Sequence, residues 1–197
     1  TIGPKAVQDQ LRAAGVPVVY FDPSRTLAGV SPQIEAVAAA LGVPDQGKAL
    51  AQRTQNEIDA ASDAVPEQQA PLRIAFVYLR GTAIAFLAGP GSGADSLIQA
   101  LGAIDAGTDS GLTQQFVPVT SEAMIAAAPD VLLTMTDGLQ SIGGVEGLQK
   151  IPGIAQTPAG KNQRVVDMAD SVLLSFGPNT GRVLAALGQA VYPAQPQ

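Results

Sequence analysis

Apolar and polar positions alternate along the chain in a way that predicts strands and helices in turn from residue 72 onward. Apolar strands are expected at 72–78, 116–119, 131–135 and 164–168. Helices are expected at 92–101, 120–128, 143–150 and 178–191. Regular alternation of this kind is typical of a largely parallel sheet that is covered by helices. The pattern therefore predicts an α/β lobe, a three-layer sandwich with a mostly parallel sheet, over residues 70–195.

The first 66 residues follow a different plan. A short amphipathic helix is expected at 5–14 and an apolar, β-branched strand at 16–21. Ser31 and Pro32 suit the start of a helix that Gly42 ends, because serine caps helices and proline fits their first turn. A longer helix at 45–64 has a thin apolar stripe. We expect residues 1–44 to be the C-terminal remnant of a second α/β lobe, and 45–66 to be a helix between the lobes.

The composition narrows the classes of function. Hydrophobic residues make up 46% and charged residues 14% of the 197 residues, as in a globular protein. A net charge of −6 argues against binding to nucleic acid or to anionic lipid. The chain contains no cysteine and no histidine, so disulfides, thiolate metal sites and a Ser-His-Asp triad are excluded. No apolar run approaches the roughly 18 residues of a membrane span, so direct membrane insertion is not expected.

Several stretches resemble the helical-backbone class of solute-binding proteins of bacterial ABC importers, which also binds cobalamin and siderophores. They are Gly3-Pro4 with 10–19, residues 93–98, 121–122 with 129–131, and 143–145 with 152–160. The run 152–160, together with Tyr78-Leu79-Arg80-Gly81, is most similar to the haem-binding, HmuT-like members. The resemblance implies an extracytoplasmic protein that captures haem between two lobes and delivers it to an ABC permease for iron acquisition. The full-length protein is expected to be a lipid-anchored monomer, and haem donor proteins are possible further partners.

A tyrosine closes the first predicted strand of the C-terminal lobe, and an arginine follows two positions later. Ligands of open α/β sheets bind beyond the carboxyl ends of the strands, so Tyr78 is expected to face a cleft, with Arg80 on the same face. A nearby guanidinium favours the phenolate, which is a hard oxygen donor suited to ferric haem. Tyr78 is therefore the candidate iron ligand and Arg80 its support, as the resemblance also implies. The alternative is a tyrosine that caps a core strand beside a solvated arginine.

Other residues are candidates for contact with haem or its propionates. The loop 89–93 precedes a helix, whose free N–H groups attract anions, so Ser92 and Gly93 could meet a propionate. A simple strand-to-helix turn is the alternative, and a nucleotide phosphate is disfavoured because the spacing of known fingerprints is missing. Leu139 and Ile142 follow the strand at 131–135 and could touch the porphyrin face. Asn179 could donate a hydrogen bond, although some relatives carry a basic residue there.

Two further expectations come from the resemblance. Both lobes of these proteins present an acidic residue to arginines of the permease, and Glu122 matches the position in the C-terminal lobe. Its alternative role is to stabilise the first turn of its own helix. Relatives from actinobacteria pair the tyrosine ligand with a histidine of the N-terminal lobe. Because this chain has none, that histidine is expected upstream of Thr1.

A transport protein needs no catalytic group, which suits a chain without histidine or cysteine. The same scaffold could instead carry a ferric siderophore or cobalamin, with Tyr78 as a wall contact and Arg80 as an anion contact. The acidic residues have no spacing that a known acid–base or divalent-metal site demands, so the chain is predicted not to be an enzyme. An apolar cleft wall that lacks its second lobe tends to pair, so we expect a dimer or a segment exchange through residues 1–66.

Overall fold

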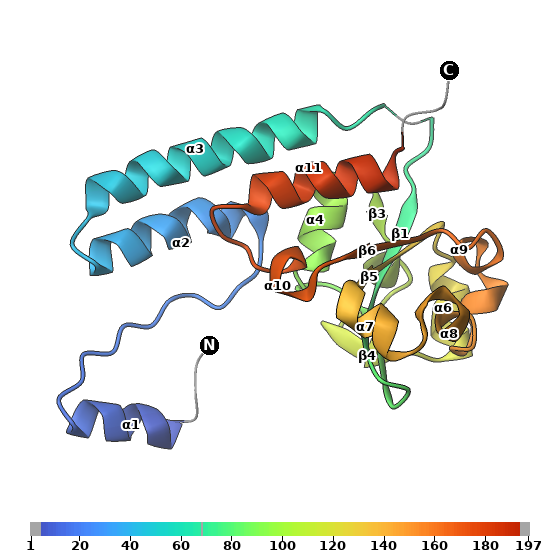
Figure 1. Ribbon diagram of the computed structural model, residues 1–197, viewed down its shortest axis with the longest axis horizontal. Coiled ribbons are helices and arrows are strands. Elements are labelled where there is room, and N and C mark those ends of the chain that lie inside the picture. Colours follow the sequence, from blue (N-terminus) through green and yellow to red (C-terminus); the bar gives the residue numbers. More distant parts are fainter. Residues whose placement is uncertain (1–4, 68, 194–197) are drawn as a thin grey trace.

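A mixed sheet lies at the centre of the lobe that the strands and their covering helices form (Figure 1). A computed structural model describes residues 5–67 and 69–193 of the chain. The strands are β1 Arg73–Arg80, β2 Ile84–Ala88, β3 Ile104–Asp105, β4 Phe116–Pro118, β5 Val131–Met135 and β6 Val165–Met168. Their order is β4-β2-β1-β5-β6, with β3 paired to the start of β1. β1 pairs in parallel with β3 and β5, as β5 does with β6, whereas β2 is antiparallel to both β1 and β4.

Helices cover both faces of this sheet, so the predicted three-layer α/β lobe is confirmed. One face packs against α4 Ala94–Ala100, α10 Asp170–Leu173 and α11 Thr180–Val191. The other face packs against α5 Ala106–Asp109, α6 Ser121–Ala127, α7 Thr136–Ser141, α8 Gly144–Leu148, the 3₁₀ turn η1 Ile154–Gln156 and α9 Pro158–Lys161. Alternate residues of β1 supply both layers, because Phe76 enters one apolar cluster and Val77 the other.

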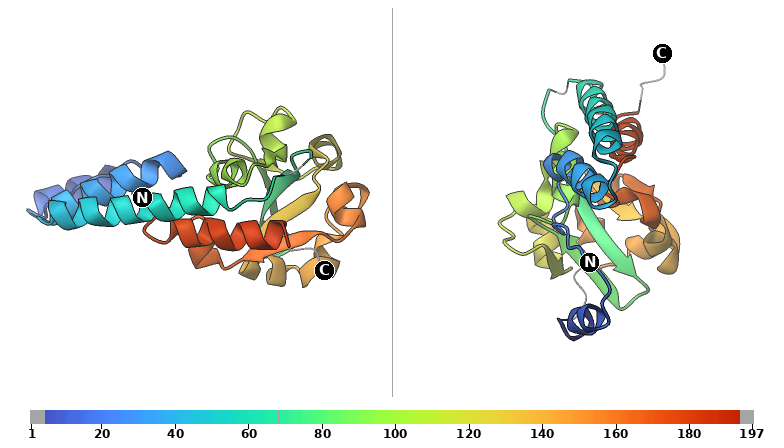
Figure 2. Two further views of the ribbon diagram at one scale, coloured as in Figure 1. Left: turned by 90° about the horizontal axis from the view of Figure 1, so that it is seen from above. Right: turned by 90° about the vertical axis from the view of Figure 1, so that its left-hand side faces the viewer.

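Two long helices form an arm beside this lobe. α2 Leu27–Ala40 and α3 Pro44–Asp63 project from it together, and α11 lies along α3 (Figure 2). Val30, Ile34 and Ile58 join the same apolar cluster as Phe76. The arm is therefore continuous with the core of the lobe. α3 is the long helix predicted for residues 45–64, and it buries only a thin stripe of its surface, as predicted.

The N-terminal segment packs least. α1 Lys5–Ala13 forms as predicted, but none of its residues is buried. The predicted strand at 16–21 is wrong, because these residues have no strand partner and adopt no regular structure. Residues 1–4, the first part of the expected remnant at 1–44, and residues 194–195 of the expected lobe at 70–195 lie outside the described residues.

Other boundaries differ for local reasons. α2 begins four residues before Ser31, because Thr26 is its cap and accepts a hydrogen bond from the Gly29 N–H at 3.1 Å. β1 continues to Arg80 and returns as β2, a strand that the sequence pattern did not predict. Within residues 5–67 and 69–193, no helix has the length and hydropathy that crossing a bilayer requires.

Candidate ligand-binding cleft

A cleft lies at the carboxyl end of β1. Ile74, Phe76, Tyr78 and Arg80 form one row of side chains, because alternate residues of a strand point to the same face. The first two are fully buried in the cluster that contains α4 and α11. Tyr78 and Arg80 are half-buried and line the cleft. Its wall is thus an uncovered continuation of the sheet core.

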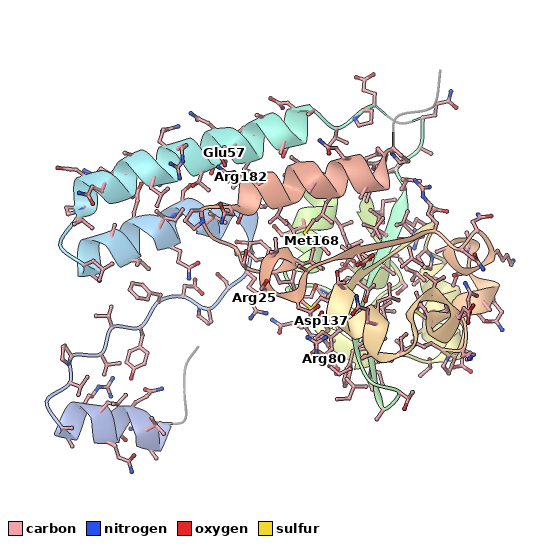
Figure 3. All side chains as sticks on the ribbon, viewed as in Figure 1. Arg25, Glu57, Arg80, Asp137, Met168 and Arg182 are labelled. Atoms are coloured by element: carbon pink, nitrogen blue, oxygen red, sulfur yellow. The ribbon has the colours of Figure 1, made fainter. Side chains whose placement is uncertain are left out.

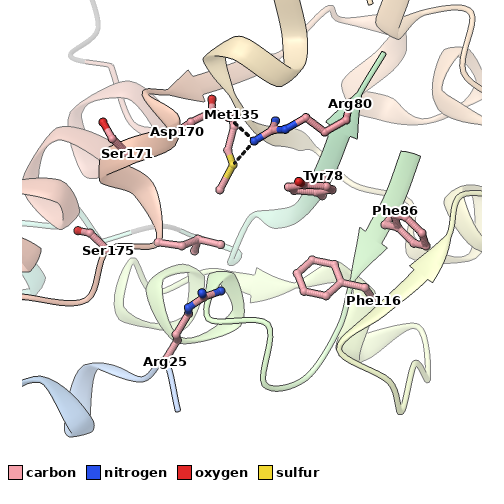
Figure 4. A pocket seen from close by; sticks show the side chains of 10 residues that line it. Arg25, Tyr78, Arg80, Phe86, Phe116, Met135, Asp170, Ser171 and Ser175 are labelled. Carbon is pink, nitrogen blue, oxygen red and sulfur yellow. Dashed lines mark hydrogen bonds and ion pairs between the residues drawn. The ribbon is translucent and has the colours of Figure 1, made fainter. Parts of the chain in front are cut away.

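The cleft has a volume of about 660 Å³ and draws its lining from segments far apart in the sequence (Figure 4). The lining residues are Arg25, Tyr78, Arg80, Phe86, Phe116, Met135, Asp170, Ser171, Leu174 and Ser175. Most of the uncharged side chains are apolar or aromatic, and the charged ones are two arginines and one aspartate. Such a surface suits a flat apolar molecule that carries a few polar groups.

Aromatic neighbours fix the position of Tyr78. Phe86 of β2 stands opposite Tyr78 in the antiparallel pair. The ring of Phe116 from β4 meets the Tyr78 ring edge to face, with centroids 6.3 Å apart and planes at 65°. Edge-to-face pairs of this kind contribute about 0.5–1.5 kcal/mol beyond burial. The phenol is therefore held in place by its ring, on the wall of the cleft where sequence reasoning expected it.

The Arg80 guanidinium lies over the face of the Tyr78 ring, with 4.8 Å from its central carbon to the ring centroid. Its Nη2 donates to Asp170 Oδ2 at 2.5 Å, and its Nη1 donates to the Leu79 carbonyl at 2.8 Å. The other oxygen of Asp170 accepts the Asp137 N–H at 2.9 Å. Arg80 is thus placed beside Tyr78 by an acidic partner, in a stacked geometry.

The structure does not bring Ser92 and Gly93 to the cleft. Asp95 already occupies the anion position of their loop: its carboxylate accepts the N–H groups of Gly91 at 2.7 Å and Gly93 at 2.9 Å. Ser92 is buried, with 2% exposed. An external carboxylate would therefore have to displace one that the chain supplies itself. The loop is a self-satisfied turn into α4, the alternative reading that the sequence left open.

The remaining candidates also lie away from the cleft. Leu139 is buried in the cluster on the opposite face of the sheet, and Ile142 packs against that cluster. Asn179 is an exposed residue that precedes α11 and does not line the cleft. Glu122 is exposed in the first turn of α6, as a docking residue must be.

Among the lining residues that sequence reasoning missed are Phe86, Arg25 and Asp170. Phe86 lies on the unpredicted strand β2, and Arg25 lies in the loop before α2. Asp170 belongs to the acidic residues whose spacing matches no known acid–base or divalent-metal site, and it pairs with Arg80 from 90 positions away. Among the described residues, no group of three or more acidic side chains is arranged to hold a bare metal ion. The cleft therefore offers a phenol oxygen, guanidinium groups and apolar walls.

Comparison with known proteins gives one family match and several similar solved structures. The family model described as periplasmic binding protein matches residues 2–172. The apo structure of the periplasmic heme-binding protein RhuT from Roseiflexus sp. RS-1 is 43% identical, with a TM-score of 0.92, over 96% of this chain and 72% of that chain. A heme-binding protein HmuT is 39% identical, with a TM-score of 0.92, over 98% of this chain and 63% of that one. HutB of Vibrio cholerae, a periplasmic heme-binding protein, is 25% identical with a TM-score of 0.83, over 97% of this chain and 74% of that one.

The chain thus spans less than two thirds of that HmuT. No curated protein sequence matches the chain. The predicted resemblance to HmuT-like binding proteins is confirmed, as is the prediction of a binding protein in place of an enzyme. The periplasmic location in the family description agrees with the predicted extracytoplasmic location. By its match over residues 2–172 and its identity to solved members, the chain belongs to the family of periplasmic binding proteins.

Proposed function

We propose that this chain captures ferric haem in the cleft, with the Tyr78 oxygen as iron ligand, and delivers it to an ABC importer for iron acquisition. The observation that carries the proposal is the place of Tyr78: on the open wall of an apolar cleft, with a guanidinium against its ring. Tyrosine is an established axial ligand of haem iron. The flat apolar surface around it suits a porphyrin.

Relatives support this assignment. RhuT, HmuT and BhuT are described as heme-binding, and BhuT is described in complex with two hemes. Structures of HmuT also exist for alanine variants of a tyrosine and of the arginine two positions after it. Tyr78 and Arg80 have the same spacing. A further HmuT variant replaces a histidine, a residue type that residues 1–197 of this protein do not contain. We propose that the second axial ligand lies outside residues 1–197.

Arg80 has a supporting role in this proposal. A cation stacked on the Tyr78 ring, within about 6 Å of its centroid, is attracted by the ring electrons and places positive charge next to the phenol. This contact helps to hold the phenol ring on the wall of the cleft. Arg80 and its ion-pair partner Asp170 both line the cleft.

The wider role follows from family membership. A binding protein of this class hands its cargo to a permease, and we propose Glu122 as the contact on this lobe because it is exposed on α6. We also propose a lipid anchor on the full-length protein, as the resemblance implies. Residues 45–66 are proposed as the backbone between two lobes, with 70–195 as the C-terminal lobe.

Titration with hemin, followed by visible absorption, tests the assignment. The unmodified chain is expected to give a Soret shift and a ferric–phenolate charge-transfer band. Tyr78→Phe should lose that band and bind hemin more weakly, by more than the roughly 10–100-fold that loss of an outer-shell partner costs. Tyr192→Phe is the matched control, because Tyr192 lies at the end of α11 and does not line the cleft. No Soret change in the unmodified chain would leave a siderophore or a corrinoid as the cargo.

A further inference from the structure

Arg25 is a cationic side chain of the cleft that the roles of Tyr78 and Arg80 leave unexplained. It lies in the loop before α2, and its guanidinium end points into the cleft (Figure 4). Among the described residues, no carboxylate lies within 4.0 Å of this guanidinium, and its side chain makes no hydrogen bond. Arg80, in contrast, is paired with Asp170. Arg25 is thus an exposed cation with no partner in this part of the chain.

Several contacts hold the backbone around Arg25 in place. The next residue, Thr26, caps α2 with its side chain. The Leu27 N–H donates to Ser96 Oγ of α4 at 3.0 Å, which ties the loop to the lobe. Gly93 leaves room beneath it, because a Cβ added there would lie 3.0 Å from Arg25 Cβ. The base of this side chain is therefore fixed, and its charged end is left for a ligand.

The charge of the cleft depends on Arg25. Its lining contains the two arginines and a single acid, Asp170, so the balance is one positive charge in a chain whose net charge is −6. Both oxygens of Asp170 are engaged, one by Arg80 and one by the Asp137 N–H. Each oxygen of Asp170 thus already accepts a hydrogen bond, and Asp170 forms no ion pair with Arg25. The cleft is a local exception to the acidic surface, and such a site attracts anions.

We propose that Arg25 binds a carboxylate at the edge of the porphyrin and so selects a porphyrin that carries free carboxylates. This role rests on the proposed haem-binding function, and it assigns to Arg25 the recognition of the ligand's carboxylate. A guanidinium pairs with a carboxylate through two parallel hydrogen bonds, and such charge-assisted bonds are stronger than neutral ones. This role replaces the one expected of Ser92 and Gly93, whose loop is filled by Asp95.

The test compares ferric protoporphyrin IX with its dimethyl ester, which has the same ring and iron but no free carboxylate. The chain should bind the free acid about tenfold more tightly than the ester, the effect of one charge-assisted hydrogen-bonded pair. Arg25→Gln should lower affinity for the acid about tenfold and leave the ester unchanged. Its ferric–phenolate band should persist, because Tyr78 still binds iron. Arg25→Lys should restore part of the preference.

Arg182→Gln is the matched control, because Arg182 is an exposed arginine of α11 that lies near Glu57 and away from the cleft (Figure 3). It should bind both porphyrins as the unmodified chain does. Equal affinity of Arg25→Gln and the unmodified chain for the acid would overturn the proposal, as would an equal loss for acid and ester. If the unmodified chain binds neither porphyrin, the proposed function fails and this inference falls with it.

Discussion

The Arg80 guanidinium is joined to the Asp170 carboxylate at 2.5 Å, and the same carboxylate accepts the backbone N–H of Asp137 at 2.9 Å. Asp170 thus ties the end of β1 to the start of α7. The pair spans 90 positions of sequence and holds the guanidinium over the Tyr78 ring. The position of Arg80 therefore depends on a residue from a distant segment of the chain, which also lines the cleft. Asp170 is a positioning residue for the cleft.

Replacement of Asp170 by alanine is expected to release Arg80 from the Tyr78 ring and to weaken hemin binding about threefold to tenfold. That range corresponds to the loss of a partly exposed, charge-assisted hydrogen bond. Asp170→Asn keeps an oxygen that can accept from Arg80 or from the Asp137 N–H, so it should bind hemin nearly as well as the unmodified chain. Hemin titration by visible absorption measures both. Unchanged affinity in Asp170→Ala would mean that the position of Arg80 does not matter.

Burial raises the pKa of Asp105, which caps α5 by accepting the Thr108 N–H at 3.1 Å. Its other oxygen is buried without a hydrogen-bond partner. Because the folded pKa lies above the unfolded value of about 3.9, the group's contribution to stability is fully present below that value. It is lost as pH rises through the folded pKa. The free energy of unfolding of the unmodified chain should therefore fall as pH rises from about 3.9 through the folded pKa of Asp105. Asp105→Asn should not show this fall.

Urea unfolding at several pH values from 4 to 7 checks this expectation. The free energy of unfolding of Asp105→Asn, relative to the unmodified chain, should rise with pH and then level off. Asp105→Ser, which retains a neutral cap, should give the same pH dependence. Parallel curves for all three proteins would show that the carboxylate carries no burial penalty.

The contact between α11 and α3 depends on the absence of a side chain at Gly181. A Cβ added there would lie 2.5 Å from Glu57 Cβ and 2.6 Å from the Glu57 carbonyl carbon. Gly181→Ala should separate the helices and lower the free energy of unfolding by about 1–3 kcal/mol. Gly188→Ala, in the same helix, meets only Leu101 Cδ2 at 3.5 Å and should gain up to about 1 kcal/mol from helix propensity. Urea unfolding of the two variants should show opposite signs.

Self-association through the N-terminal segment stays a prediction. Val7 and Leu11 of α1 are 46% and 40% exposed, and no residue of α1 is buried. Replacement of both by serine should reduce the dimer fraction seen by sedimentation equilibrium, because it removes the apolar face that would pair. Ile125→Ser is the control, since Ile125 is 54% exposed on α6. A sharp monomer in concentrated solutions of the unmodified chain would contradict the expectation.

Glu122 provides a test of permease docking that is separate from cargo binding. Glu122→Lys should leave hemin affinity unchanged, because Glu122 does not line the cleft, and should reduce transfer to the permease in proteoliposomes. It should also cost about 0.3–1 kcal/mol of stability, because a cation at a helix N-terminus opposes the helix dipole. Glu146→Lys, an exposed first-turn acid of α8, controls for that effect. Full transfer by Glu122→Lys would exclude this contact.

The pattern of apolar and polar residues predicted most elements of the lobe. Burial of one or both faces of an element determines where its apolar residues fall. β5 matches the expected strand at 131–135, and α3 matches the expected long helix within a residue at each end. The strand at 16–21 was wrong for the opposite reason: β-branched residues favour a strand, but a strand forms only against a partner. β2 was missed because five apolar residues without a clear period do not indicate a type of element.

Residues of the site also fall into those that the sequence could place and those that it could not. Tyr78 could be placed from its strand and from the spacing to Arg80. Leu139 was misplaced because α7 begins directly after β5, and a helical turn carries that side chain to the opposite face of the sheet. Arg25 could not be found from sequence, because its position depends on a contact between Leu27 and Ser96, 69 positions apart.

The row of side chains from Ile74 and Phe76 to Tyr78 links ligand binding to the thermal stability of the lobe. The residue that would bind iron shares one strand with the centre of the hydrophobic core, so we expect the cleft wall and the lobe to unfold together. Occupancy should therefore raise the melting temperature of the lobe as a unit. At a cargo concentration of 100 times Kd, the gain is about 2.7 kcal/mol. Phe76→Leu should lower the melting temperature, although the buried Phe76 side chain cannot contact a ligand. Ligand binding in the cleft should restore part of that loss.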